Sequence, residues 1–128
     1  MKHEDTVRAA FTRQASHFGD PGLTLSSQEL LTWAVDLLPL GSHDRVLDVA
    51  AGTGHLSRAI APRVRRVVAV DMTRAMLTQA GTAEGQRQCV EADAARLPLR
   101  PDTFDIVVSR LALHHFEDPI VQLREMAR

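Results

Sequence analysis

The segment Val46–Ser57, with the sequence VLDVAAGTGHLS, constrains the fold more than any other part of this chain. A short β-branched run passes into a turn of small residues, and a stretch of helical character follows. Gly52 and Gly54 permit positive φ angles and let backbone N–H groups approach a ligand closely. The helix that follows would direct its positive dipole end at the same turn. A glycine turn between a strand and a helix can also be only a tight connection, so the surrounding sequence has to decide between the two.

Short apolar runs alternate with stretches of helical period along the chain, a pattern typical of βαβ units around a parallel sheet. Strands are predicted at 45–49, 66–70, 88–92 and 104–109. The runs at 67–70 and 106–108 are almost continuously apolar, which indicates strands covered on both faces. Helices are predicted at 4–18, 54–61, 73–80 and 117–127. A further helix is expected to begin at a capping box formed by Ser26 and Glu29.

Composition and length fit one soluble domain. The chain has 128 residues, 45% of them hydrophobic and 24% charged, with a net charge of −1. This balance gives no general attraction to nucleic acid or to anionic membranes. Cys89 is the only cysteine, the N-terminus lacks the apolar core of a signal peptide, and no apolar run is long enough to span a membrane. We therefore expect a cytoplasmic protein without a membrane span and without a nucleic-acid partner.

Two aspartates near the glycine turn favour one class of ligand. Asp71 ends the second predicted strand, where a carboxylate can accept both hydroxyls of a ribose. Asp48 lies in the first strand, where it would repel a pyrophosphate but attract the ammonium and sulfonium of S-adenosylmethionine. Ser57 also occupies the position of the third glycine of the dinucleotide fingerprint. These residues favour S-adenosylmethionine, and a nicotinamide dinucleotide stays as the alternative.

The segment Val46–Ser57 resembles motif I of class I S-adenosylmethionine-dependent methyltransferases, most closely the ubiquinone- and menaquinone-biosynthesis subgroup and its small-molecule relatives. Three further blocks, at 67–77, 91–99 and 104–116, agree with this family in order and spacing. The resemblance implies an α/β fold with a Rossmann-like, doubly wound parallel sheet. It also implies one domain overall, in which N-terminal helices in residues 1–40 cover the donor site of a core at 41–128.

The family resemblance assigns the methionyl end of the donor to one group of residues. The backbone of the glycine turn would hold this end, through Ala50, Gly52, Thr53 and Gly54. Asp48 would act on the ammonium, directly or through water, and Ser109 would line the same side. Phe11 and Phe18 resemble aromatic residues that close over the donor, although their helical spacing also suits core packing.

The family resemblance assigns the adenosine end of the donor to residues that follow the second and third strands. The resemblance implies that Asp71 holds the ribose and that Met72 packs on the adenine, as a thioether can. Asp93 would accept from the adenine amino group, and Ala94 would offer its backbone N–H. Met72 can also be an ordinary core residue, and Asp93 can simply cap a turn.

His114 and His115 are the only candidates for catalysis that the sequence offers. The family has adjacent histidines here without a metal, and one of them would face the acceptor as a general base. Adjacent helical residues do not share a face, and no cluster of cysteines or carboxylates completes a ligand set. No metal is therefore expected.

The expected activity is transfer of a methyl group from S-adenosylmethionine to a small-molecule acceptor, leaving S-adenosylhomocysteine. A non-catalytic S-adenosylmethionine-binding module and an NAD-dependent oxidoreductase are the alternatives. The family fold has seven strands, whereas this sequence supplies four and ends in the helix after the fourth. We therefore expect a truncated, N-terminal part of the fold, or a homodimer or strand-swapped pair that covers the exposed fourth strand.

Overall fold

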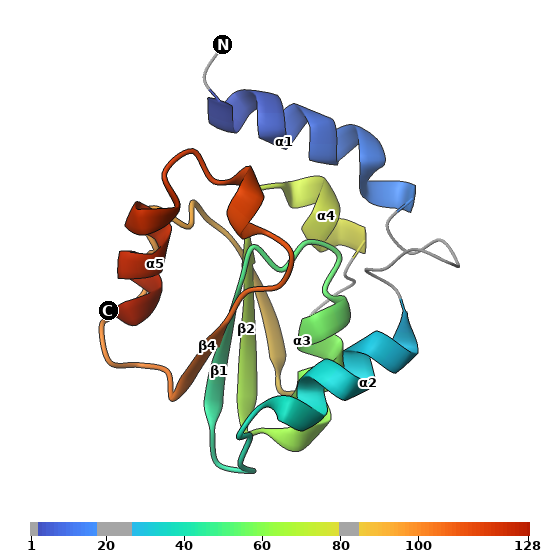
Figure 1. The fold of residues 1–128 in the computed structure, drawn as a ribbon, viewed down its shortest axis with the longest axis vertical. Coiled ribbons are helices and arrows are strands. Elements are labelled where there is room, and N and C mark those ends of the chain that lie inside the picture. Colours follow the sequence, from blue (N-terminus) through green and yellow to red (C-terminus); the bar gives the residue numbers. More distant parts are fainter. Residues whose placement is uncertain (1–2, 18–26, 80–84) are drawn as a thin grey trace.

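Four parallel strands form the centre of the molecule. The computed structural model describes residues 3–17, 27–79 and 85–128 (Figure 1). The strands are β1 (Arg45–Val49), β2 (Arg66–Asp71), β3 (Arg87–Glu91) and β4 (Ile106–Val108). Their order in the sheet is β3-β2-β1-β4, and every neighbouring pair is parallel. All four predicted strands are present, and the predicted α/β fold with a Rossmann-like parallel sheet is confirmed.

The fourth strand is shorter than predicted because hydrogen bonds outside the regular ladder replace it at both ends. Before it, the Asp105 N–H donates to the Arg45 carbonyl over 2.9 Å, and the Asp105 carboxylate accepts from the Arg45 N–H over 2.8 Å. After it, the Ser109 hydroxyl donates to the Val49 carbonyl over 2.9 Å. Such side-chain bonds compete with regular strand pairing. Residues 104–109 therefore stay beside β1, but only three of them form a strand.

The helices follow the predicted pattern with shifted ends. They are α1 (His3–Gln14), α2 (Gln28–Leu37), α3 (His55–Ile60), α4 (Arg74–Gln79) and α5 (Pro119–Ala127), with the 3-10 turns η1 (Ala15–His17), η3 (Ala61–Arg63) and η4 (Leu113–His115). The cap of α2 is Ser27, whose hydroxyl accepts from the Leu30 N–H over 3.4 Å. The cap was therefore predicted one residue too early, since the predicted Ser26 lies outside the described residues and Ser27 is the N-cap.

The two faces of the sheet are covered by different helices. Figure 1 shows α2, α3 and α4 on one side of the sheet and α5 on the other. Side chains alternate along β1, so Val46 packs in the cluster with α2 and α3, while Leu47 and Val49 pack in the cluster that Met126 of α5 joins. Asp48 lies on the same face as Val46, where its side chain is buried.

The order in which the chain adds strands to the sheet reverses its direction at β1. From β1 the chain moves outward to β2 and β3, and it then returns to place β4 on the other side of β1. Ligands of open α/β sheets bind at such a switch point, outside the carboxyl ends of the strands. In Figure 1, α1 passes across these strand ends. Within the described ranges, no helix has the length and apolar character needed to cross a membrane.

Candidate functional site

A cavity of about 450 Å³ opens at the carboxyl edge of the sheet. Its walls come from α1, from the loops after β1, β2 and β3, and from the segment that follows β4. This volume suits a small organic ligand. Most of the predicted donor-site residues line it: Phe11, Asp48, Ala50, Gly52, Thr53, Asp71, Met72, Asp93 and Ala94. Gly54 and Ser109 are not among its lining residues, and Phe18 lies outside the described part of the chain.

The turn between β1 and α3 has the unusual backbone that its glycines suggested. Gly52 and Gly54 have φ angles of 58° and 80°, and Ala50 adopts 57° although it carries a Cβ atom. Left-handed conformations in residues other than glycine cost on the order of 1–3 kcal/mol and cluster at functional sites. Gly54 is the N-cap of α3. The turn therefore curves tightly at the edge of the cavity and leads directly into the helix.

Asp71 holds this turn against the end of β2. Its Oδ2 accepts from the Gly52 N–H and its Oδ1 from the Thr73 N–H, both over 2.9 Å. Burial raises the pKa of Asp71, and the N–H groups of Thr73 and Gly52 oppose that rise. A carboxylate offers about four acceptor positions, so Asp71 can also accept from a ligand's hydroxyl groups.

Asp48 is a buried carboxylate beneath the turn. Its side chain is 1% exposed, and its Oδ2 has no hydrogen-bond partner within the described structure. Burial, together with repulsion from Asp71, raises the pKa of Asp48 to about 7, while the Ser57 N–H and the Arg110 guanidinium oppose the rise. A buried carboxylate without full compensation is costly. The site therefore fits a ligand that brings a positive charge or a hydrogen-bond donor to this atom.

The wall after β2 and β3 holds the residues predicted for the adenosine end. Met72 lines the cavity and belongs to neither core cluster. Asp93 also lines it, while its Oδ1 accepts from the Ala95 N–H over 2.8 Å. Asp93 thus caps a turn and faces the cavity at once, so the two interpretations of this residue are compatible.

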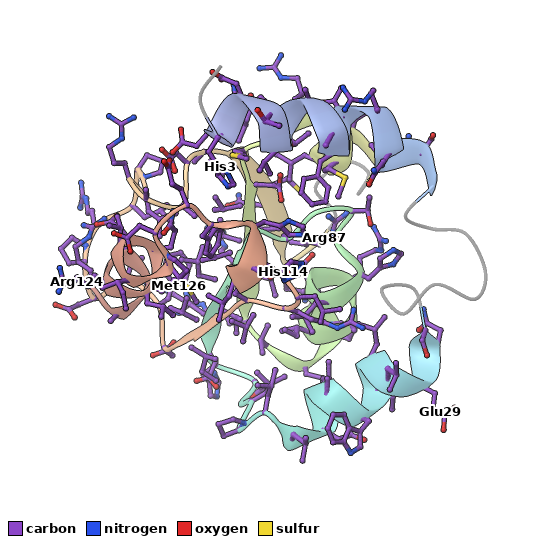
Figure 2. The ribbon with its side chains drawn as sticks, turned by 45° about the horizontal axis from the view of Figure 1, so that its top comes forward. His3, Glu29, Arg87, His114, Arg124 and Met126 are labelled. Atoms are coloured by element: carbon purple, nitrogen blue, oxygen red, sulfur yellow. The ribbon has the colours of Figure 1, made fainter. Side chains whose placement is uncertain are left out.

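The cover of the cavity joins α1 to the segment after β4. The rings of Phe11 and His115 meet edge to face with centroids 4.8 Å apart, and His3 Nε2 donates to the His115 carbonyl over 2.9 Å. Figure 2 shows His3 on α1 and His114 on η4. Of the helices predicted in residues 1–40, α1 lines the cavity, whereas the described α2 packs Leu31 and Val35 into the core beside α3.

His114 and His115 both line the cavity, and their ring centroids lie 3.9 Å apart. Burial lowers the pKa of His115, and the neighbouring His114 and His3 lower it further. The imidazole of His115 is therefore neutral at pH 7 and able to accept a proton. Among the described residues, no group of three or more His, Cys, Asp or Glu side chains is placed to hold a metal ion.

The cavity residues that the sequence analysis did not name include Arg110 and Gln122. Arg110 follows Ser109 and lines the cavity, and Gln122 of α5 lines it with a buried side-chain oxygen, Oε1, that has no partner in the described structure. Arg110 lies beyond the end of β4, where strand alternation no longer fixes the direction of a side chain, so no sequence pattern indicated it. Gln122, in contrast, had a signal in the sequence. Gln122 is a polar residue four positions before Met126, which packs against the core.

The family of the chain follows from a comparison with known domains. Residues 47–128 match the family model described as a methyltransferase domain. The chain belongs to this methyltransferase family. The match begins inside β1 and covers the glycine turn, the strands β2 to β4 and the histidine pair. The predicted resemblance to class I methyltransferases is thereby confirmed.

Individual relatives agree with this assignment. The uncharacterized methyltransferase YcgJ of Bacillus subtilis is 31% identical over 96% of this chain and 50% of its own length. Its crystal structure superposes with a TM-score of 0.73, at 32% identity, over 80% of this chain and 46% of that chain. The demethylmenaquinone methyltransferase of Renibacterium salmoninarum is 32% identical over 99% of this chain and 55% of its own length. The chain thus spans about half the length of the relatives it matches.

A more distant solved structure shares the fold. The magnesium protoporphyrin IX methyltransferase ChlM of Synechocystis PCC 6803, solved with bound S-adenosylmethionine, has a TM-score of 0.74 at 19% identity. The superposition covers 98% of this chain and 71% of that chain.

Proposed function

We propose that this chain binds S-adenosylmethionine at the carboxyl edge of its sheet and serves in transfer of the methyl group to a small-molecule acceptor. The observation that carries the proposal is Asp48, a buried carboxylate beneath the glycine turn with one oxygen that has no partner among the described residues. A diphosphate in this turn would meet a like charge, whereas the ammonium of a methionyl group supplies the missing partner. Membership of the methyltransferase family supports the same ligand.

The chain's own residues divide the work of holding the donor. Asp48 accepts from the ammonium, Asp71 accepts from the ribose hydroxyls, and Met72 packs on the adenine ring. Asp93 accepts from the adenine amino group, and the Ala94 N–H donates to the edge of the adenine ring. Bound S-adenosylmethionine supplies an activated methyl group on a sulfonium, which is a good leaving group.

The remaining tasks are orientation, exclusion of water and, for some acceptors, removal of a proton. Phe11 and His3 close the cavity from α1, which limits water at the donor. A neutral His115, or His114 beside it, accepts the proton of an acceptor that must lose one. The acceptor named for the Renibacterium salmoninarum relative, demethylmenaquinone, is the first molecule to try.

Isothermal titration calorimetry of the purified chain with S-adenosylhomocysteine and with NAD tests the proposal. We expect heat of binding from S-adenosylhomocysteine and none from NAD at the same concentration. Tighter binding of NAD would overturn the proposal in favour of the oxidoreductase alternative. A turnover assay with methyl-labelled donor then separates a catalyst from a non-catalytic binding module, because both require the same donor site.

The assignments to a small-molecule acceptor, a cytoplasmic location, the absence of a nucleic-acid partner and pairing through β4 stay predictions. The edge position of β4 supports the last of these, because an edge strand leaves backbone hydrogen-bonding groups available. Sedimentation of the purified chain at several concentrations tests it.

A further inference from the structure

The cavity holds an excess of carboxylates and a single permanently charged cation. Among the described residues that line it, the carboxylates belong to Glu4, Asp48, Asp71, Asp93 and Glu117, whereas Arg110 is the only arginine or lysine. A negatively charged part of a ligand is therefore repelled by most of the charged wall. The one place where an anion gains from a permanent charge is beside Arg110.

The backbone places Arg110 close to Asp48. Val108 is the register partner of Asp48 across β1 and β4, and it lies on the face of the sheet that Val46 occupies. Arg110 follows two residues later, just beyond the end of the strand, and it lines the same cavity as Asp48. The hydroxyl of Ser109 fixes the intervening residue to the Val49 carbonyl over 2.9 Å.

The charges of the two side chains interact. Burial lowers the pKa of Arg110, and the attraction of Asp48 acts in the opposite direction. The same attraction opposes the rise in the pKa of Asp48. A carboxylate and a guanidinium thus face one cavity within electrostatic reach of each other.

An α-amino acid has the complementary arrangement, because its ammonium and its carboxylate are attached to the same carbon atom. We propose that Arg110 binds the α-carboxylate of the donor's methionyl end while Asp48 binds its α-ammonium, so that the pair recognises the amino-acid zwitterion. A guanidinium suits this task because its planar fork can donate two parallel hydrogen bonds to a carboxylate. This inference rests on the proposed function and adds to it a residue that selects the intact amino-acid end.

The test compares the binding of three ligands to the original chain and to its variants by calorimetry. The variants are Arg110→Gln and the matched control Arg124→Gln, an exposed arginine on α5 that Figure 2 places away from His3 and His114. The ligands are S-adenosylhomocysteine, its decarboxylated analogue, which keeps the amine, and 5′-methylthioadenosine, which lacks the amino-acid end. Circular dichroism and thermal melting establish that each variant is folded.

We expect Arg110→Gln to weaken binding of S-adenosylhomocysteine about 10- to 100-fold, the range for hydrogen bonds to a charged group. Its affinity for the decarboxylated analogue and for 5′-methylthioadenosine should stay within about twofold of the original chain, since neither ligand has the carboxylate. Arg124→Gln should leave all three affinities unchanged. Arg110→Lys should recover part of the loss, because it keeps the charge but not the planar fork.

Other outcomes contradict the inference in distinguishable ways. An equal loss for all three ligands in a folded Arg110→Gln variant would overturn it, because the arginine would then act on the adenosine site as a whole. Unchanged binding of S-adenosylhomocysteine would also overturn it and would leave an acidic acceptor as the ligand of Arg110. If the original chain bound neither S-adenosylhomocysteine nor 5′-methylthioadenosine, the proposed function itself would fail.

Discussion

The Gly52 N–H donates to Oδ2 of Asp71 over 2.9 Å, so the turn after β1 is fixed to the carboxyl end of β2. The same carboxylate accepts from the Thr73 N–H through its other oxygen. One side chain thus shapes two loops of the cavity and is also the group assigned to the ribose. Its replacement should affect both the stability of the fold and the binding of the donor.

Asp71→Ala should weaken binding of S-adenosylhomocysteine by about 1.5–3 kcal/mol, the range for a hydrogen bond to a charged group. The variant should also be less stable by on the order of 1–3 kcal/mol, because the partly buried N–H groups of Gly52 and Thr73 lose their acceptor. Calorimetry measures the first effect and urea unfolding the second. A loss of binding below about 0.5 kcal/mol would contradict the ribose assignment, since even a neutral hydrogen bond contributes that much.

Gly52→Ala and Gly85→Ala form a matched pair for the glycine turn. Both glycines have positive φ angles, 58° and 53°, but an added Cβ at Gly52 would meet Cε of Met76 at 3.0 Å, whereas at Gly85 it meets nothing within 4 Å. Each variant should lose about 1 kcal/mol of stability from backbone strain. Gly52→Ala should lose about 1 kcal/mol more from the close contact and should alone weaken donor binding. Equal losses of stability and equal donor binding for the two variants would mean that the Met76 side chain moves aside without a measurable loss of free energy.

Binding of S-adenosylhomocysteine should weaken as the pH falls below 7. In the free protein burial raises the pKa of Asp48 to about 7, and only its ionised form attracts an ammonium. Below that pH the carboxyl group must first lose a proton, so the dissociation constant should rise about tenfold per pH unit, the usual cost of removing one proton. Calorimetry between pH 5.5 and 8 measures this slope. Asp48→Asn is the control and should give a flatter profile with weaker binding at pH 8.

Asp48→Asn should nevertheless stabilise the ligand-free protein at neutral pH. The pKa of Asp48 in the folded state, about 7, lies above the 3.8 of an unperturbed aspartate, so between these pH values the folded state keeps a proton that the unfolded state loses. The contribution of this group to stability is therefore complete below about pH 4 and is lost as the pH rises through 7. The loss amounts to up to about 4 kcal/mol, from roughly three pKa units.

Urea unfolding of the original chain and of Asp48→Asn at pH 5 and pH 8 measures this difference. The gain in stability of the variant should be larger at pH 8 than at pH 5. An equal difference at both pH values would show that the carboxyl group titrates alike in the folded and unfolded states.

The sequence predicted the sheet because its strands depend on local patterns. The mostly apolar runs at β1 and β2 favour strands over other structures, and both strands are buried on each face. The ends of elements were less predictable because they depend on single side chains. Asp105 and Ser109 shorten β4 through bonds to Arg45 and Val49, which lie sixty positions away in the chain. Ser27, not Ser26, caps α2, and two adjacent serines offer the same chemistry.

The site was predictable where a residue's role follows from its position at a strand end. Asp48, Asp71 and Asp93 meet at one edge because parallel strands bring their carboxyl ends together. The sequence did not indicate that the Ser109 hydroxyl is used by the Val49 carbonyl, or that Arg110 beside it lines the cavity. Both depend on how the chain leaves β4, which no periodicity specifies.

Oδ2 of Asp48 has no hydrogen-bond partner among the described residues, so this buried atom is left for a ligand to satisfy. The cationic end of a bound ligand would donate to this oxygen, so the ligand would stabilise the fold as well as take part in the reaction. Proton release should accompany its arrival near pH 7, so the measured heat of association should change with the ionisation enthalpy of the buffer. Occupancy and folding stability are thus linked through a single carboxyl group.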